Sequence, residues 1–438
     1  MSKNRIDVDV AVIGAGPAGI AAAMEASRAG LAVAVVEAHR VGGAAAWHTQ
    51  LPWRSLERAA DQKASFASAV SRADALATRW EARQALRLGD AGCVRVEGHA
   101  VFSGPRAMRV TNGDQTTEVS FDHAVIATGA EPVTLEGDEP DGETLFVPSQ
   151  LMTRETLPDK MLVVGGGAAG AELCDALVRL GGVELTWLMD DYGLLPRFDR
   201  ELAEAFGDVL MERGVKLVHG KAVKSVAVGD AGVTATLDGG HTYIAPVAVL
   251  ALGTRPRLDG LRLERAQVPP GPLAPDPQGR IAPTVFAVGT CTGRARSVAA
   301  AEAMGTVAGL AIAGDTEARF HADRIPMVAR TRPLLAQVGQ TPERVGGREV
   351  IFHTLRLEST IGGLLDGVGE TEHDKGLLRV VCDSDTGEVL GGTAFGPGAE
   401  DTISAVALAM QLHATDEQLA ELFGASPSHL GALGRAVR

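Results

Sequence analysis

Two stretches of the chain repeat one pattern of apolar and polar positions, about 150 residues apart. Each begins with a short apolar run, at residues 8–13 and again at 160–164. A glycine-rich turn follows, then an alanine-rich helical segment, then a second apolar run at residues 31–37 and 183–188. A buried run, a glycine turn, a helix and a second buried run form the βαβ unit of a doubly wound sheet. We therefore expect two such units.

The pattern around these units predicts further elements and a change of architecture towards the C-terminus. The expected elements are a helical stretch over about residues 54–78, strands near 123–129, 249–256 and 284–290, and an alanine-rich helix ending near residue 312. From about residue 324 the pattern changes to strands joined by hairpin-like turns, such as residues 383–387, followed by two helices. This change indicates a separate α+β domain of about 110 residues.

The glycines of the two turns have the spacing of a dinucleotide-binding turn. They are Gly14, Gly16 and Gly19 in the first copy, and Gly165, Gly167 and Gly170 in the second. The first glycine makes the tight bend, the second lets the backbone approach a pyrophosphate, and the third lets the helix pack on the strand. Glycine turns also occur by chance, but each copy here follows a predicted strand and opens a predicted helix. We expect two dinucleotide sites, with phosphates at the helix N-termini.

The copies differ in the acidic residue expected to bind the nucleotide ribose. Glu37 ends the second strand of the first copy, where a carboxylate accepts hydrogen bonds from a ribose diol. The equivalent residue of the second copy is Met189, followed by Asp190. No arginine or lysine stands there to receive a 2′-phosphate. The sequence therefore favours NADH over NADPH at the second site, with Asp190 as its ribose ligand.

Composition and charge narrow the possible partners. The 438 residues include 53 glycines and carry a formal net charge of −14. An acidic chain without clustered lysine and arginine argues against nucleic acid as a partner, and no apolar run of about 18 residues predicts a membrane span. The four cysteines are Cys93, Cys174, Cys291 and Cys382. Their wide separation predicts neither a metal site nor disulfides, and favours a cytoplasmic protein with reduced thiols.

These motifs, in this order and over nearly the whole chain, resemble the pyridine nucleotide–disulfide oxidoreductases, the family of dihydrolipoamide dehydrogenase, glutathione reductase and mercuric reductase. The matching segments are residues 14–19 with Glu37, 42–43, 127–129, 165–170 with Glu172, 252–256, 325–326, 391–392 and 396–397. The resemblance implies bound FAD and NAD(P)H, and a homodimer. It adds Gly43, Thr128, Gly129, Gly253, Gly289 and Thr290 to the expected cofactor-binding residues.

The expected fold class is α/β, with two doubly wound, Rossmann-like nucleotide-binding domains and a C-terminal α+β dimerisation domain. Residues 1–150 form the first part of the FAD-binding domain, and residues 151–266 form the NAD(P)-binding domain. Residues 267–320 return to the FAD-binding domain, and residues 321–438 form the dimerisation domain.

Three departures from the family pattern concern its chemistry. The two redox cysteines of the family fall on Ala45 and Gln50, neither of which can form a thiolate. The histidine and glutamate of the family's C-terminal base fall on Ser426 and Gly431. The aspartate that binds the flavin ribitol becomes Thr290, which offers one hydroxyl and no charge. Disulfide reduction by the family mechanism is therefore not expected.

Three residues are the candidates for catalysis. The family's lysine beside the flavin becomes Arg54, and Glu172 is expected to pair with it. The alternative for Glu172 is a first-turn helix residue stabilised by the helix dipole. His48 could relay protons in an acceptor pocket. Alternatively, bulky side chains fill the space left by the lost cysteines; the residues concerned are Trp47, His48, Gln50 and Trp53.

Three functions fit this sequence. The favoured one is an FAD-dependent NAD(P)H oxidoreductase that exchanges electrons with a non-disulfide small molecule such as a quinone, oxygen or a specialised metabolite. The identity of that molecule and the direction of electron flow stay open. A second function is that of a flavin-binding subunit or sensor without turnover. In a third, a substitute thiol such as Cys291 restores disulfide chemistry.

Overall fold

The computed structural model of the chain describes residues 4–135, 139–370 and 375–438, so a few positions of the predicted domains lie outside it. The chain forms two compact units. The first comprises residues 1–55, 67–132 and 254–322, and the second comprises residues 56–66, 133–253 and 323–438. Each unit is therefore assembled from three separate parts of the chain.

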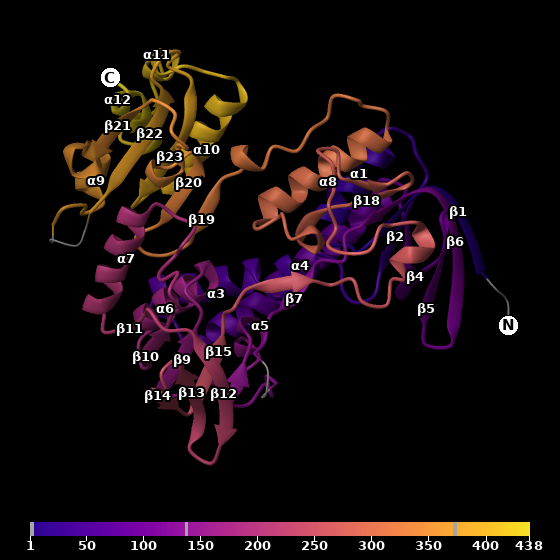
Figure 1. The fold of residues 1–438 in the computed structure, drawn as a ribbon, viewed down its shortest axis with the longest axis horizontal. Coiled ribbons are helices and arrows are strands. Elements are labelled where there is room, and N and C mark those ends of the chain that lie inside the picture. Colours follow the sequence, from indigo (N-terminus) through magenta and orange to yellow (C-terminus); the bar gives the residue numbers. More distant parts are fainter. Residues whose placement is uncertain (1–3, 136–138, 371–374) are drawn as a thin grey trace. The chain divides into compact units, whose positions relative to one another are not determined.

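An eight-stranded sheet forms the centre of the first unit (Figure 1). Its strands are β1 (Asn4–Ile13), β2 (Val33–Glu37), β3 (Val94–Glu97), β4 (His99–Gly104), β5 (Ala107–Asn112), β6 (Gln115–Ile126), β17 (Arg280–Ala282) and β18 (Val285–Ala287). Strands β18, β6, β1, β2 and β3 are parallel neighbours in that order. A two-stranded antiparallel ribbon of β7 (Ala130–Pro132) and β16 (Thr254–Pro256) also belongs to this unit.

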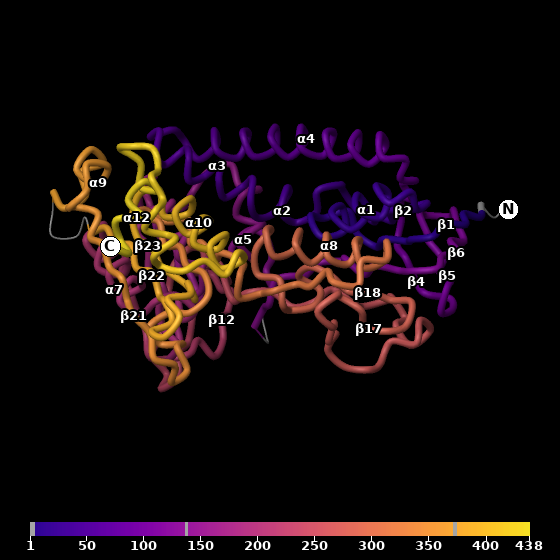
Figure 2. Tube along the Cα trace, turned by 90° about the horizontal axis from the view of Figure 1, so that it is seen from above, coloured from indigo at the N-terminus to yellow at the C-terminus, as the bar shows by residue number. Residues whose placement is uncertain are grey.

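Two helices of the first unit pack closely through small residues. Helix α1 (Pro17–Arg28) follows the first glycine turn, and α8 (Val298–Ile312) runs beside it (Figures 1 and 2). A Cβ atom on Gly305 would collide with the carbonyl oxygen of Ala18, and one on Gly309 would lie 2.7 Å from the Cβ of Glu25. The backbones therefore approach more closely than larger residues would allow.

A five-stranded parallel sheet forms the part of the second unit that is predicted to bind NAD(P). Its order is β11 (Lys216–Val218), β10 (Glu184–Leu188), β9 (Lys160–Val164), β15 (Val247–Leu250) and β8 (Leu145–Phe146). Its helices are α5 (Pro148–Leu151), α6 (Ala168–Leu180) and α7 (Arg200–Glu212). An antiparallel sheet of β12 (Val223–Gly229), β13 (Gly232–Leu237) and β14 (Thr242–Ala245) accompanies it.

The C-terminal part of the second unit is a five-stranded antiparallel sheet with helices (Figure 1). Its order is β19 (Met327–Ala329), β20 (Leu335–Gly339), β23 (Val389–Phe395), β22 (Leu377–Asp383) and β21 (Val350–Arg356). The helices are α9 (Ile361–Leu365), α10 (Ala399–Gln411), α11 (Asp416–Ala420) and α12 (Leu433–Ala436). Residues of α10 and α12 share one buried core with the sheet.

Ion pairs connect the two parts of the second unit. Asp199, the N-cap residue of α7, accepts a hydrogen bond from Arg379 of β22 at 2.9 Å. The buried Asp175 of α6 pairs with Arg213 at 2.8 Å and accepts from the backbone N–H of Arg332 at 3.2 Å. The contacts made by Arg379 and by the Arg332 backbone join the parallel sheet region to the antiparallel one, whereas Asp175 and Arg213 both belong to the parallel sheet region.

The predicted α/β fold class, with two doubly wound domains and a C-terminal α+β domain, is confirmed. The helical stretch predicted over about residues 54–78 consists of two helices: α3 (Gln50–Asp61) and the 25-residue α4 (Phe66–Asp90), which Figure 2 shows as one long helix. Lys63 takes a left-handed conformation, with φ of 51°, which ends α3. No helix in the described part of the chain is long and apolar enough to cross a membrane.

Candidate functional site

In the first glycine turn, two glycines leave no room for a side chain, whereas the third has free space beside it. A Cβ atom on Gly14 would collide with the carbonyl oxygen of Ala127, and one on Gly19 would collide with that of Gly14. Gly16 has ordinary extended backbone angles, and a Cβ there would have no heavy atom nearer than 4.0 Å. Gly16 therefore faces space in front of the N-terminus of α1, where a pyrophosphate would sit.

The remaining residues predicted for the first site surround this space. Glu37 ends β2, and its carboxylate accepts hydrogen bonds from the N–H groups of Ala15 at 2.7 Å and His39 at 2.9 Å. Gly43 approaches the turn so closely that its Cβ would lie 2.9 Å from the Cα of Gly16. The carboxylate is thereby held at the turn, and its remaining lone pairs can receive a ribose hydroxyl.

The second group of predicted residues meets the same turn from the end of β6 and from the 3-10 helix η2 (Gly289–Thr292). The Thr128 hydroxyl donates to the carbonyl of Arg257 at 2.6 Å. A Cβ on Gly129 would lie 3.8 Å from Oγ1 of Thr290, and one on Gly289 would lie 2.8 Å from the Cβ of Ala18. All nine cofactor residues predicted for the first site therefore gather in one region.

In the second glycine turn, too, two glycines leave no room for a side chain and one has free space beside it. Cβ atoms on Gly165 and Gly170 would collide with the carbonyl oxygens of Ala251 and Gly165, whereas Gly167 has no heavy atom within 4 Å of the position of a Cβ. Trp187 fills the space behind the turn, because its buried Nε1 donates to the carbonyl of Gly165 at 2.9 Å. The open glycine at the N-terminus of α6 again fits a pyrophosphate.

The strand register shows where the ribose carboxylate of the second site would lie. Leu188 pairs with Val164, so Met189 lies opposite Gly165, as Glu37 lies opposite Gly14. Met189 is buried, and Asp190 is exposed with its Oδ1 accepting from the N–H of Tyr192 at 3.1 Å.

Gly253, the last residue predicted for this site, follows β15. Its φ is 92°, and its carbonyl accepts from the N–H of Val133 at 3.0 Å. The second site thus assembles its predicted glycines around one turn. A carboxylate in the position corresponding to Glu37 is missing from it, because Met189 occupies that place.

Ala45 and Gln50, which the sequence analysis predicts at the family's cysteine positions, lie in α2 (Gly43–Trp47) and at the start of α3. Trp47 points back onto its own segment: Arg40 stacks 3.3 Å from its ring centroid, and its Nε1 donates to the carbonyl of Val41 at 3.3 Å. Trp53 is buried, in accord with a space-filling role. Gln50 is exposed. The four bulky residues therefore do not form one uniform plug.

His48 is the predicted proton relay, and it lies at the C-terminal end of α2 with an exposed side chain. Partial removal from water lowers its pKa, and the positive charges of Arg257 and His39 lower it further. A histidine with a lowered pKa is neutral at pH 7 and can accept a proton.

All four cysteines are buried and free. Burial raises the pKa of Cys291 to about 12, and its Sγ lies 3.1 Å from the carbonyl of Val288 and 3.3 Å from that of Ile126. Burial also raises the pKa of the Cys174 thiol. Thiols in such surroundings are poor nucleophiles at neutral pH, because the thiolate is the reactive form.

Arg54 lies in the part of α3 that belongs to the first unit, and Glu172 lies in α6 of the second. The Glu172 carboxylate accepts from the backbone N–H of Arg330 at 3.0 Å. The first-turn interpretation of Glu172 is wrong, because α6 begins at Ala168 and Glu172 is its fifth residue. The pairing of Arg54 with Glu172 stays a prediction.

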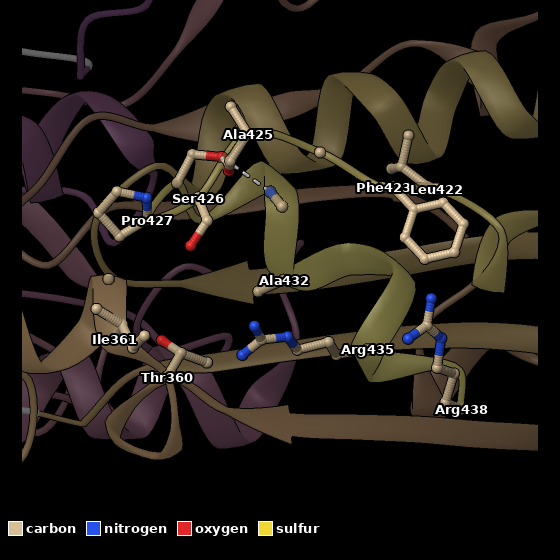
Figure 3. Close-up of a pocket in the computed structure, with 14 residues that line it drawn as sticks. Thr360, Ile361, Leu422, Phe423, Ala425, Ser426, Pro427, Ala432, Arg435 and Arg438 are labelled. Carbon is tan, nitrogen blue, oxygen red and sulfur yellow. Dashed lines mark hydrogen bonds between the residues drawn. The ribbon is translucent and has the colours of Figure 1, made fainter.

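The C-terminal segment predicted to replace the family's base borders a pocket of about 190 Å³ (Figure 3). Ser426 and Gly431 both line it, and the Gly431 N–H donates to the Ser428 hydroxyl at 3.0 Å. His429 is directed elsewhere, with its Nε2 2.6 Å from Oδ2 of Asp366. The described segment thus contains a histidine–carboxylate pair, but not at the positions the family uses.

The chain belongs to the pyridine nucleotide-disulphide oxidoreductase family. The sequence model of this family matches residues 8–305, and the model of the family's dimerisation domain matches residues 325–437. Members of this family are flavin-dependent NAD(P)H oxidoreductases. Among the relatives, dihydrolipoyl dehydrogenase 2 from Haloarcula marismortui is 31% identical to this chain, over 98% of this chain and 96% of the relative.

Two relatives from Mycobacterium tuberculosis are similar over almost their full lengths. An NAD(P)H dehydrogenase (quinone) is 29% identical over 98% of this chain and 93% of its own. The crystal structure of LpdA superimposes with a TM-score of 0.92 at 28% identity and covers 99% of both chains.

Some contacts around the sites were not predicted from the sequence. The Arg40–Trp47 stack joins residues on either side of the glycine pair, and the Trp187–Gly165 hydrogen bond joins the end of a strand to a turn. A buried tryptophan needs a partner for its N–H, which is the one signal that could have indicated the second contact.

Proposed function

We propose that this chain is an FAD-dependent NAD(P)H oxidoreductase that passes electrons to a non-disulfide small molecule, with a quinone as the acceptor. The observation that carries the proposal is the replacement of both redox cysteines by Ala45 and Gln50, while the four cysteines present are buried. The two open glycine turns support retention of both nucleotide sites. The likeness to an NAD(P)H dehydrogenase (quinone) supports the choice of acceptor.

Bound FAD would accept a hydride from the nicotinamide and pass two electrons to the acceptor. The residues of this chain would hold and orient the groups. Glu37 would bind the adenosine ribose of the flavin nucleotide, and the backbone at Gly16 and Gly167 would approach the two pyrophosphates. Arg54 would stabilise negative charge, and neutral His48 would accept a proton from solvent and pass it on to the quinone oxygen.

Several finer predictions accompany this proposal. They are the preference for NADH through Asp190, the Arg54–Glu172 pair, the homodimer formed through the domain at residues 321–438, and a cytoplasmic location. The four-segment domain division also stays a prediction.

The test begins with the purified protein loaded with FAD under anaerobic conditions. NADH should bleach the flavin absorbance, and a benzoquinone should restore it, because electrons need no cysteine to reach a quinone. Lipoamide and glutathione disulfide should restore it at less than about one hundredth of that rate. Fast reduction of either disulfide would contradict the proposal.

Two variants separate direct transfer from a substitute thiol. Cys291→Ala and Cys174→Ala should reduce the quinone at the wild-type rate, because both thiols are buried with raised pKa values. Loss of activity in Cys291→Ala with retained flavin would favour thiol chemistry instead.

A second function is favoured by the replacement of the base by Ser426 and Gly431 and of the ribitol aspartate by Thr290. In this alternative the chain binds flavin as a subunit or sensor and does not turn over. Bound flavin that neither NADH nor NADPH bleaches would support it and contradict the enzyme.

A further inference from the structure

Three side chains with metal-ligating atoms meet in the C-terminal part of the second unit, far from one another in the sequence. They are His353 of β21, Cys382 of β22 and Asp416, the first residue of α11. Their ligand atoms all lie within 4.8 Å of one another, and Nε2 of His353 is 3.2 Å from Oδ2 of Asp416. None of the three belongs to the nucleotide sites described above.

The backbone holds all three side chains in place. His353 pairs directly with Val380, and Ile351 pairs with Cys382, so His353 and Cys382 lie on the same face of the sheet as diagonal neighbours. Asp416 is fixed by the hydrogen bond from its N–H to the carbonyl of Gly387 at 2.9 Å.

The helix that carries Asp416 also begins with a capping box. The Thr415 hydroxyl accepts from the N–H of Gln418 at 3.3 Å, and the Gln418 side chain accepts from the N–H of Thr415 at 3.0 Å. A ligand set that is positioned before the ion arrives binds it with less loss of entropy.

The chemistry of the three groups selects one kind of cation. A thiol and an imidazole favour borderline-soft ions, and Mg²⁺ and Ca²⁺ prefer oxygen donors throughout. A zinc ion bound by sulfur, nitrogen and oxygen atoms has ligands about 2.0–2.3 Å away. Ligand atoms grouped within 4.8 Å of one another need only small adjustments to surround such an ion.

The three side chains of the cluster differ in their exposure to solvent, so an ion can reach the cluster from one side. Cys382 is fully buried, whereas the side chains of His353 and Asp416 are 20% and 19% exposed. An ion can therefore enter from the side of the imidazole and carboxylate, where a water molecule can complete a tetrahedral set.

We propose that His353, Cys382 and Asp416 bind one Zn²⁺ ion per chain, with water as the fourth ligand. This proposal differs from the prediction of no metal, which rested on the spacing of the cysteines in the sequence. The ion would connect the edge strand β21, the neighbouring β22 and the start of α11, and would stabilise the C-terminal domain. In binding, the Cys382 thiol loses its proton to solvent as the sulfur–zinc bond forms, so one proton is released per ion.

The test uses the full-length protein after treatment with a chelator. Zn²⁺ is titrated in competition with a chromophoric chelator, and Co²⁺ is added to a second sample. We expect one tight Zn²⁺ per chain, a higher melting temperature with Zn²⁺ than with Mg²⁺, and a thiolate-to-cobalt absorption band. Absence of tight binding, or a cobalt spectrum without the thiolate band, would overturn the proposal.

Variants assign the binding to these residues. Cys382→Ser and His353→Gln should each weaken Zn²⁺ binding at least tenfold. His413→Gln is the matched control, because His413 forms an exposed pair with Glu388 at 2.6 Å in the same domain, and it should bind Zn²⁺ like the wild type. Wild-type affinity in Cys382→Ser, or an equal loss in His413→Gln, would contradict the assignment.

Circular dichroism shows whether the two ligand variants still fold, by comparison with the metal-free wild type. His353→Gln is the milder of the two changes, because His353 lies on an edge strand whereas Cys382 is buried. These measurements do not use flavin or nicotinamide, so their outcome is independent of the proposed enzymatic function.

Discussion

Glycines of the same turn have different physical reasons to be glycine. Gly14 and Gly165 have positive φ values, and a Cβ on either would collide with a backbone carbonyl, so they serve the fold. Gly16 and Gly167 have extended backbone angles that any residue can adopt, and the space beside them is open. The fold does not require glycine at these two positions, which points to a ligand that approaches the backbone there.

Valine at either open glycine should separate ligand binding from folding. Gly16→Val should reduce the fraction of protein that retains FAD at least tenfold, because the side chain enters the space of the pyrophosphate. Gly167→Val should retain FAD and raise the Kd for NADH at least tenfold. Flavin content after gel filtration and NADH titration measure the two effects.

The two valine variants serve as controls for each other, since each changes one turn only. Both should keep wild-type circular dichroism. Retention of flavin by Gly16→Val, or loss of flavin by Gly167→Val, would show that the sites are assigned to the wrong cofactors.

The carboxylate of Asp141, in the loop before β8, leads to a prediction about how the stability of the protein depends on pH. Slight burial opposes ionisation of Asp141, but the N–H groups of Thr144, Glu143 and Leu145 outweigh it and lower the pKa of this carboxyl. A lowered folded-state pKa stabilises the protein above the usual aspartate range, and this contribution is lost as the pH falls through the lowered value.

Asp141→Ala should therefore melt at a lower temperature than the wild type at pH 7, and the difference should shrink as the pH falls to about 3. Glu143→Ala, in the same loop, should melt like the wild type at both values. A difference for Asp141→Ala that stays constant from pH 7 to pH 3 would contradict this account.

At the level of elements, the contact between α1 and α8 connects distant parts of the chain in the first unit. The contact depends on small residues, since a Cβ on Gly305 would collide with the backbone of Ala18. Because α1 begins at the first glycine turn, displacement of α8 would also disturb the proposed FAD site. Tight helix packing is thus part of how the nucleotide turn is positioned.

Gly305→Ala should lower the free energy of unfolding by about 1–3 kcal/mol, because the added methyl group overpacks the helix contact. Gly89→Ala is the matched control: Gly89 lies in α4 with no heavy atom within 4 Å of a Cβ. That change should raise the free energy of unfolding by up to about 1 kcal/mol. Urea unfolding measures both, and stabilisation by Gly305→Ala would contradict the packing argument.

The sequence predicts elements and turns well where the signal is local. Both βαβ units and the position of Met189 follow from glycine spacing and apolar runs. The break between α3 and α4 was missed, because Lys63 in a left-handed conformation carries no proline or glycine signal. The cluster of His353, Cys382 and Asp416 could not be predicted either, because strand register brings these residues together.

At the level of the whole molecule, the chain has two glycine turns of the dinucleotide-binding type, and the sequence predicts a change in the groups that handle thiol chemistry. The resemblance to the family predicts that four positions of that chemistry are occupied by Ala45, Gln50, Ser426 and Gly431. The cysteines that remain are distributed over both units and are all buried. These changes belong together if electrons leave the flavin directly, since a dithiol relay would need reactive thiols and a base.

The number of electrons that the protein takes up tests this claim most directly. A flavin accepts two electrons, and a redox-active disulfide beside it would accept two more. Anaerobic titration with dithionite should bleach the flavin completely with one two-electron equivalent per flavin, and Cys291→Ala should give the same value. Uptake of two equivalents per flavin, or a thiolate–flavin charge-transfer band during the titration, would contradict the account.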